Sequence, residues 1–169
     1  ALGKGLSGVF PVAATVGRAE ILDMYQPGEM SSTWGSHVLG CVATLENLSV
    51  LNDEGLVARS AKLGMILHET LHQLLSTFPI VGVIAGKGLV AGIQIVDPQT
   101  KNPDPNRAAK IVDLCIANGV MLFSPVGPGG NTIKLCPPLC IESEALLEGV
   151  QVIVDAVKKV ENEVIPVCA

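Results

Sequence analysis

Lys4 is the first residue of the chain whose type and setting could do chemistry. It lies between Gly3 and Gly5 in the stretch GKGLSG, whose glycines favour a tight turn. A lysine becomes a nucleophile toward carbonyl cofactors when the pKa of its ammonium group is lowered. Flanking glycines would let a bulky cofactor ring approach the backbone. Composition alone favours a solvated turn lysine, so the residues at this point leave both interpretations open.

The same stretch, residues 3–8, also matches the dinucleotide fingerprint G-x-G-x-x-G literally. That fingerprint requires a preceding strand, a helix that opens at the glycines, and an acidic residue about 20 positions further on. Only two residues precede Gly3, and Pro11 falls where the helix should run. The β-branched run that follows suits a strand better than a helix. The spacing therefore argues against a dinucleotide site.

A second candidate is His68-Glu69-Thr70-Leu71-His72, which matches the metalloprotease motif H-E-x-x-H. Histidines at i and i+4 share a helix face, so His68 and His72 could bind zinc while Glu69 acts as the base. The extension that supplies a third ligand, H-x-x-G-x-x-H, is absent, since QLLSTFP follows. A zinc-dependent hydrolase is therefore kept as an alternative. The preferred interpretation is that residues 68–72 are part of a structural helix.

Composition excludes several other functions. The net charge is −5, and the 11 lysines and arginines are scattered, which argues against a nucleic-acid surface. No run of 18 apolar residues occurs, so no membrane-spanning helix is expected. The glycine-rich GPGGN, residues 127–131, lacks the Lys-Ser/Thr pair and the following helix of a phosphate-binding P-loop. A length of 169 residues suits one domain, or one domain and a small piece, with ample apolar material for a core.

The 5 cysteines lie beside apolar residues and form no C-x-x-C pair. They predict reduced, buried thiols and a cytoplasmic protein, not a disulfide or zinc framework. Because the chain starts without methionine and no strand feeds the Lys4 turn, we expect the sequence to be part of a longer protein.

Hydrophobic periodicity and turn residues predict the elements that would position these side chains. Helices are expected at 19–24, from about 38 to 54, from 56 to Pro79, at 107–117 and at 142–160. Strands are expected at 9–16, 120–124 and 132–136, with a hairpin around Gly86-Lys87-Gly88. Residues 26–36 form a polar loop. Helices and strands alternate after residue 76, which predicts an α/β or α+β layer.

Four segments in order give the chain a family resemblance. They are GKGLSGVFPVAATVGRAEILD, SSTWGS before a long helix, GKGLVAGIQI, and GGNTIKLCPPLCI. Together they resemble the C-terminal part of class III aminotransferases, the ω-aminotransferase-like enzymes that use pyridoxal 5'-phosphate. The resemblance covers essentially all 169 residues. It implies an α/β fold of type I, with the end of the large domain followed by the small C-terminal domain.

The resemblance implies roles for single residues. Lys4 resembles the lysine that binds the cofactor covalently and then moves a proton between substrate and cofactor. Thr33, with Ser32 beside it, resembles the threonine that donates to the cofactor phosphate of the neighbouring subunit, which implies a homodimer. The alternative for Thr33 is a hydroxyl that stabilises its own turn. Lys134 lies where many relatives have an arginine that binds the substrate carboxylate.

The chain departs from the family pattern at three places. Ser36, His37 and Val38 stand where Gly-Asn-Pro usually follows the Trp-Gly pair, which leaves the local turn open. Lys134 cannot reproduce the two-pronged bond of an arginine to a carboxylate. It binds a carboxylate less rigidly, or it is a strand lysine that faces solvent. Ala85 also replaces a frequent arginine.

We therefore expect an enzyme that moves an amino group from an ω-amine or ω-amino acid to a keto acid, with no nucleic acid or membrane as partner. Residues 1–37 would end the large cofactor-binding domain, residues 38–75 would form connecting helices, and residues 76–169 would form the small domain. The family's other cofactor contacts lie upstream of Lys4, so these residues alone should be inactive. A non-catalytic fragment of the same fold is the remaining alternative. A decarboxylase, racemase or mutase would carry the same lysine.

Overall fold

The computed structural model describes residues 1–162, and the chain divides into two units, Ala1–Leu56 and Val57–Ala169. The expected domain boundaries after residues 37 and 75 stay predictions. The first unit contains the 3-10 turn η1 (Lys4–Leu6), α1 (Ala19–Leu22) and α2 (Val38–Asp53). Helix α3 (Leu56–Leu75) leads into the second unit, where it is followed by β1 (Val81–Lys87), β2 (Val90–Ile95), α4 (Pro105–Ala117), β3 (Thr132–Leu135) and α5 (Ser143–Glu161).

The second unit is built on an antiparallel sheet of three strands in the order β1-β2-β3. The predicted hairpin joins β1 to β2, where Gly88 has a φ of 56°, a value that favours glycine. Strand β3 pairs with β2 so that Lys134 lies opposite Gly92. The sequence therefore predicts the hairpin and β3 correctly, and the mixed α and β fold is confirmed.

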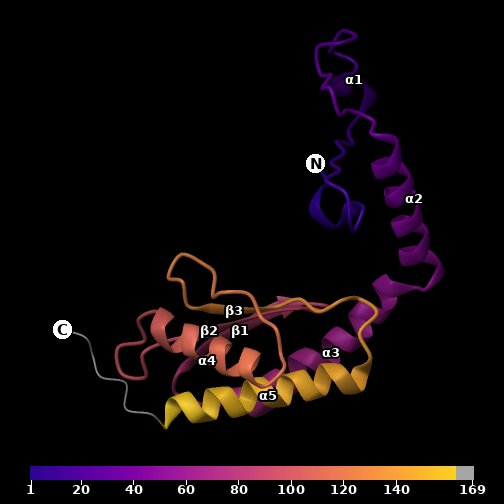
Figure 1. Cartoon of the computed structure of the whole chain (residues 1–169). Helices are drawn as coiled ribbons and strands as arrows, with labels where there is room; N and C mark the ends of the chain where they lie inside the picture. Colours follow the sequence, from indigo (N-terminus) through magenta and orange to yellow (C-terminus); the bar gives the residue numbers. More distant parts are fainter. Residues whose placement is uncertain (163–169) are drawn as a thin grey trace. The chain divides into compact units, whose positions relative to one another are not determined.

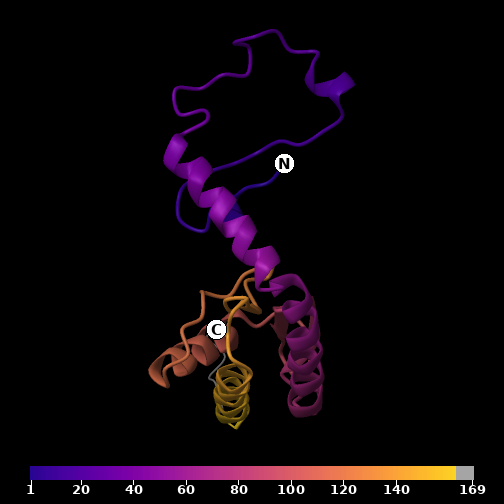
Figure 2. The ribbon, with the colours of Figure 1, turned by 90° about the vertical axis from the view of Figure 1, so that its right-hand side faces the viewer.

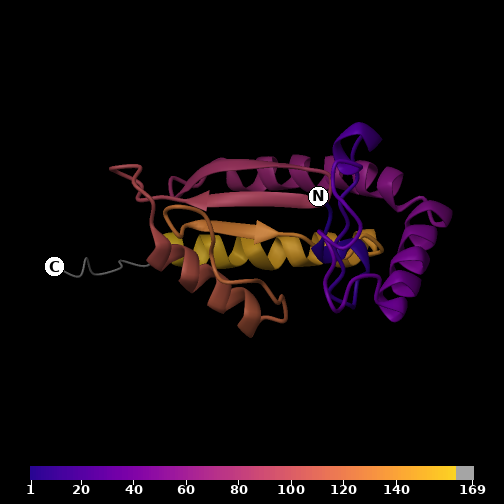
Figure 3. The same cartoon turned by 90° about the horizontal axis from the view of Figure 1, so that it is seen from above.

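Helices α3, α4 and α5 lie on one side of this sheet (Figures 1 and 3). Figure 2 shows α5 between α4 and α3. Side chains alternate across a strand, so one residue in two of β2 and β3 points toward these helices. The core that results includes Leu67, Leu71, Ile93, Ile111, Ile133, Ile153 and Val157. The opposite face keeps Val90, Gln94 and Lys134 exposed.

Helix α3 passes unusually close to the hairpin turn. A Cβ at Gly64 would lie 2.4 Å from the Cα of Gly88, and a Cβ at Gly88 would lie 2.8 Å from the Ser60 hydroxyl oxygen. That hydroxyl accepts a hydrogen bond from the Leu89 amide at 3.3 Å. The pair of glycines therefore lets the helix backbone and the turn backbone touch, which fixes the hairpin against α3.

Helix α2 in the first unit exposes a large apolar surface. Val38, Leu39, Val42, Leu45 and Leu48 are all between 46 % and 71 % exposed. No helix of residues 1–162 is nevertheless long and apolar enough to cross a membrane. An exposed apolar patch of this kind is typical of a surface that other protein covers.

Two of the predicted strands are wrong. In the first, residues 9–16, only Ala14 makes a bridge, with Leu2, because Pro11 has no amide to donate and no strand lies alongside. In the second, residues 120–124, the Val120 amide instead donates to the carbonyl of Cys115 at the end of α4, at 2.9 Å. The neighbouring Pro125 again lacks a donor, so this segment is apolar and extended without joining the sheet.

The prediction of buried thiols is correct only for Cys115. Its side chain is fully buried in the core, and this burial raises the pKa of the Cys115 thiol to about 11. Cys41, Cys136 and Cys140 are free and exposed, because Cys41 lies on an outward face of α2 and the other two lie in the loop between β3 and α5. Cys168 falls outside the described residues. Proximity to apolar neighbours in the sequence therefore did not distinguish a core position from a surface one.

Two helical glycines give a matched test of the contact between α3 and the hairpin. Gly64→Ala should destabilise the protein by about 1–3 kcal/mol, because the added methyl group meets backbone that cannot yield. Gly149→Ala in α5 should stabilise it by up to about 1 kcal/mol, since a Cβ there has nothing within 4 Å and alanine favours helix. Chemical denaturation of the two variants measures both. Equal effects would show that the close approach is unimportant.

Candidate functional site

The Lys4 turn presents its amine to solvent in an unusual backbone conformation. Lys4 is exposed and has a φ of 54°, in the left-handed region that residues other than glycine rarely adopt. A Cβ built at the neighbouring Gly5 would have nothing within 4 Å. Residues held in such conformations are concentrated at functional sites. The glycine-flanked turn predicted from the sequence is therefore present, and it leaves room beside the lysine.

Asn47 of α2 holds this turn in place. Its side-chain amide donates to the carbonyl oxygens of Gly5 at 3.0 Å and Leu6 at 3.1 Å. On the other side of the turn, Leu2 and Ala14 exchange two backbone hydrogen bonds of 2.7 and 3.0 Å. Sequence reasoning missed Asn47. The only available signal was an asparagine in a helix interior, where this residue type is disfavoured without a particular role.

The loop before α2 carries the two predicted hydroxyl groups. Ser32 and Thr33 are exposed, and the Gly35 amide donates to the Ser32 carbonyl at 3.0 Å, which closes a turn over these residues. Within residues 1–162, neither side-chain hydroxyl has a hydrogen-bond partner. Both hydroxyls are therefore free to donate to an anion, as the resemblance implies for Thr33.

The departure from Gly-Asn-Pro is accommodated in the structure at the start of α2. Ser36 takes a φ of 57°, which glycine would adopt without strain. His37 is the N-cap, and its Nδ1 accepts a hydrogen bond from the Gly40 amide at 3.2 Å. Asparagine would cap a helix in the same way. The helix therefore begins where the resemblance expects it, with an imidazole as the cap.

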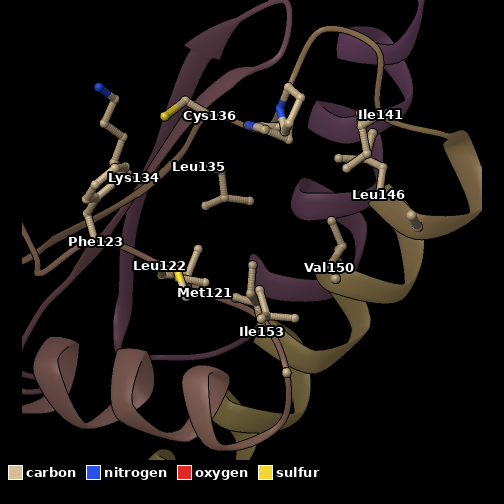
Figure 4. A pocket seen from close by; sticks show the side chains of 16 residues that line it. Met121, Leu122, Phe123, Lys134, Leu135, Cys136, Ile141, Leu146, Val150 and Ile153 are labelled. Carbon is tan, nitrogen blue, oxygen red and sulfur yellow. The ribbon is translucent and has the colours of Figure 1, made fainter. Parts of the chain in front are cut away.

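Lys134 lies in β3 on the exposed face of the sheet, opposite Gly92. At the end of the strand it also borders a cavity of about 340 Å³, which lies between the segment after α4, the end of β3 and helix α5. Figure 4 shows Leu135 and Ile153 pointing into this mainly apolar cavity, whereas the Lys134 amine points away from it. The sequence predicted Lys134 as a candidate, but not the cavity.

The metalloprotease-like motif does not form a metal centre in the described part of the chain. Glu69 and His72 are exposed on α3, and His68 is half-buried near Gly86. No group of three His, Cys, Asp or Glu side chains capable of holding a metal ion occurs in residues 1–162. The helix therefore supplies two histidines on one face without a third ligand.

The predicted site residues fall into both units. Lys4, Ser32 and Thr33 belong to the first unit, and Lys134 belongs to the second. Within the first unit, the Lys4 turn and the Thr33 loop are linked through α2, because Asn47 bonds the turn and His37 caps the helix where the loop ends. A lysine amine and two hydroxyl groups are thus presented from one short scaffold.

Comparison with known proteins gives a consistent result. The family model described as aminotransferase class-III matches residues 1–157. A probable 4-aminobutyrate aminotransferase of Bacillus subtilis (strain 168) is 37% identical over 151 residues, 89% of this chain and 34% of the relative. An isoleucine 2-epimerase of Lentilactobacillus buchneri is 34% identical over 163 residues, 95% of this chain and 35% of the relative.

Solved structures of aminotransferases also resemble the chain. An ornithine aminotransferase from Toxoplasma gondii, described as having partial occupancy of pyridoxal phosphate at its active site, superposes with a TM-score of 0.83. It is 31% identical, and the match covers 94% of this chain and 36% of that one. The chain thus spans about a third of the length of the proteins it matches.

Two asparagines of α2 test how the Lys4 turn is held. Asn47→Ala removes both hydrogen bonds to the turn, so amide hydrogen exchange in residues 3–8 should become roughly tenfold faster. Asn52→Ala is the matched control, because its side chain bonds only to the adjacent Asp53, at 3.5 Å. Exchange measured by mass spectrometry on the peptide that contains residues 3–8 distinguishes the two variants. An unchanged exchange rate in Asn47→Ala would contradict the role of this amide.

Proposed function

Because the chain belongs to the class-III aminotransferase family, we propose that it is the C-terminal portion of a pyridoxal-phosphate-dependent aminotransferase. The enzyme would transfer an amino group from an ω-amine or ω-amino acid to a keto acid. The observation that carries this proposal is Lys4, an exposed lysine in a glycine-flanked turn with a left-handed backbone, in a chain that matches the family model from its first residue. Family membership supplies the cofactor, pyridoxal 5'-phosphate.

The residues at the Lys4 turn fit this cofactor. An amine is the group that reacts with the cofactor's aldehyde, and the open space at Gly5 admits a ring beside it. When bound, the cofactor supplies an electron sink for the substrate carbon. Lys4 then contributes the proton chemistry, since its amine takes a proton from one carbon and returns it to another. The hydrogen bonds from the Asn47 side chain hold the turn that carries Lys4 and so keep that amine in position.

Thr33 and Ser32 are the proposed phosphate ligands. Their hydroxyl groups lie on exposed residues of the turn and are donors of the kind that phosphate oxygens accept. The resemblance assigns Thr33 to the site of the neighbouring subunit, so the working enzyme would be a homodimer. The exposed apolar side chains of α2 support this proposal, because they would be covered by the rest of the enzyme or by the second subunit.

Lys134 is the proposed substrate-binding residue. Its ammonium group would attract a substrate carboxylate as a point charge, without the geometric selection of an arginine fork. The facing residue, Gly92, has no side chain to compete for that space. Amines or amino acids and keto acids would therefore be the small-molecule partners, in a cytoplasmic enzyme.

A second candidate reaction is epimerisation of an amino acid. The relative that favours it is the isoleucine 2-epimerase, which is nearly as similar as the 4-aminobutyrate aminotransferase. The same lysine would remove and return a proton at the same substrate carbon. The reaction products separate the two activities, because an epimerase yields the inverted amino acid and no keto acid.

Lys4 and Lys87 form a natural matched pair, since each is an exposed lysine between two glycines. In the protein expressed from its gene, Lys4→Ala should lower kcat for transamination of 4-aminobutyrate or 5-aminovalerate by about 10²–10⁴-fold, the usual contribution of a general acid/base. Lys87→Ala should leave kcat close to that of the unchanged protein. Formation of keto acid measures the rate. Full activity of Lys4→Ala would refute the proposed function.

A further inference from the structure

The N-cap of α2 is an imidazole, and it contacts both of the segments that carry the proposed cofactor ligands. The His37 ring centroid lies 5.9 Å from that of Phe10, in the segment that follows the Lys4 turn. It lies 5.8 Å from that of Trp34, the residue next to Thr33, in an edge-to-face arrangement. His37 is half-buried and meets three parts of the first unit at one point.

The first turn of α2 is packed tightly against the same place. A Cβ at Gly40 would lie 2.5 Å from Val12 and 3.4 Å from the His37 Nδ1. Gly40 is buried, and its amide is the donor that His37 accepts. The amide thus cannot turn to solvent when its acceptor is lost, and an unsatisfied buried donor is costly.

The hydrogen bond from the Gly40 amide depends on the protonation of the imidazole. Nδ1 can accept from the Gly40 amide only when it carries no proton, so this contact belongs to neutral histidine. A second proton would remove the acceptor. It would also place a positive charge at a helix N-terminus, where the helix dipole disfavours cations. Histidine is the side chain that ordinarily changes charge between about pH 5 and 8.

The surroundings of His37 offer little to offset that charge. The segment 10–12 and the loop before α2 present the rings of Phe10 and Trp34. The titratable residue in the first turn of α2 is Cys41, whose backbone amide donates to the His37 carbonyl at 2.9 Å. Within residues 1–162, no carboxylate forms an ion pair with His37.

We propose that His37 is a positioning residue of the cofactor site: its neutral imidazole pins the loop that carries Ser32 and Thr33 to α2, and protonation releases this pin. The assignment of the loop to the cofactor rests on the proposed function. The contacts of His37 with Gly40 and Trp34 do not depend on the proposed function, since the structure shows them directly. Cofactor phosphate would therefore be held less firmly once the imidazole is protonated.

Trp34 is the single tryptophan of the chain, so its fluorescence reports on this contact directly. In the 169-residue protein, Trp34 emission should change in a one-proton transition as the pH is lowered and Nδ1 of His37 gains its proton. Over the same transition, the protection of the Gly40 amide from exchange, relative to its intrinsic rate at each pH, should fall roughly fivefold as the cap is lost. Neither measurement requires the cofactor, so both test the role of His37 even if the protein has no transaminase activity.

Two variants make the test specific. His37→Asn should abolish the fluorescence transition and keep the protection of the Gly40 amide constant with pH, because asparagine caps a helix without titrating. His72→Asn, on the exposed face of α3, should leave the transition unchanged. If His37→Asn does not fold, His37→Ser serves in its place. The proposal is overturned if the unchanged protein shows no transition, or if the same transition persists after His37 is replaced.

Discussion

The proposed site depends most on the hydrogen bonds from the Asn47 amide to the carbonyl oxygens of Gly5 and Leu6. A turn of three residues has few contacts of its own, and its lysine sits in a backbone conformation that is costly for a side chain. Two hydrogen bonds from a 16-residue helix provide the restraint that the turn cannot provide itself. Because the same helix begins at His37, one element also sets the position of the loop with Thr33.

The second unit rests on a different constraint, the contact of α3 with the β1–β2 hairpin through Gly64 and Gly88. That contact sets the sheet against α3, and the pairing of β3 with β2 then places Lys134 opposite a glycine on the open face. The two units thus present different chemistry, an amine with two hydroxyl groups in the first and a cation on a flat strand surface in the second.

The sequence predicted the long helices, the hairpin and β3, because their periodicity and turn residues agree with the tertiary contacts. It failed at residues 9–16 and 120–124, where apolar residues suit a strand but a proline and a competing hydrogen bond prevent pairing. The motifs and the resemblance proposed Lys4 and Thr33 as site residues. The sequence did not predict the role of Asn47 or the capping role of His37. Each side chain forms hydrogen bonds with backbone atoms, which no residue pattern in the sequence reveals.

The central claim is that Lys4 carries the cofactor. The most direct measurement is the mass of the protein expressed from its gene after incubation with pyridoxal phosphate and reduction with borohydride, followed by peptide mapping. The account predicts one pyridoxyl-phosphate group per chain, on the peptide that contains Lys4. A group on Lys87 or spread over several lysines, or an unmodified chain, would contradict it.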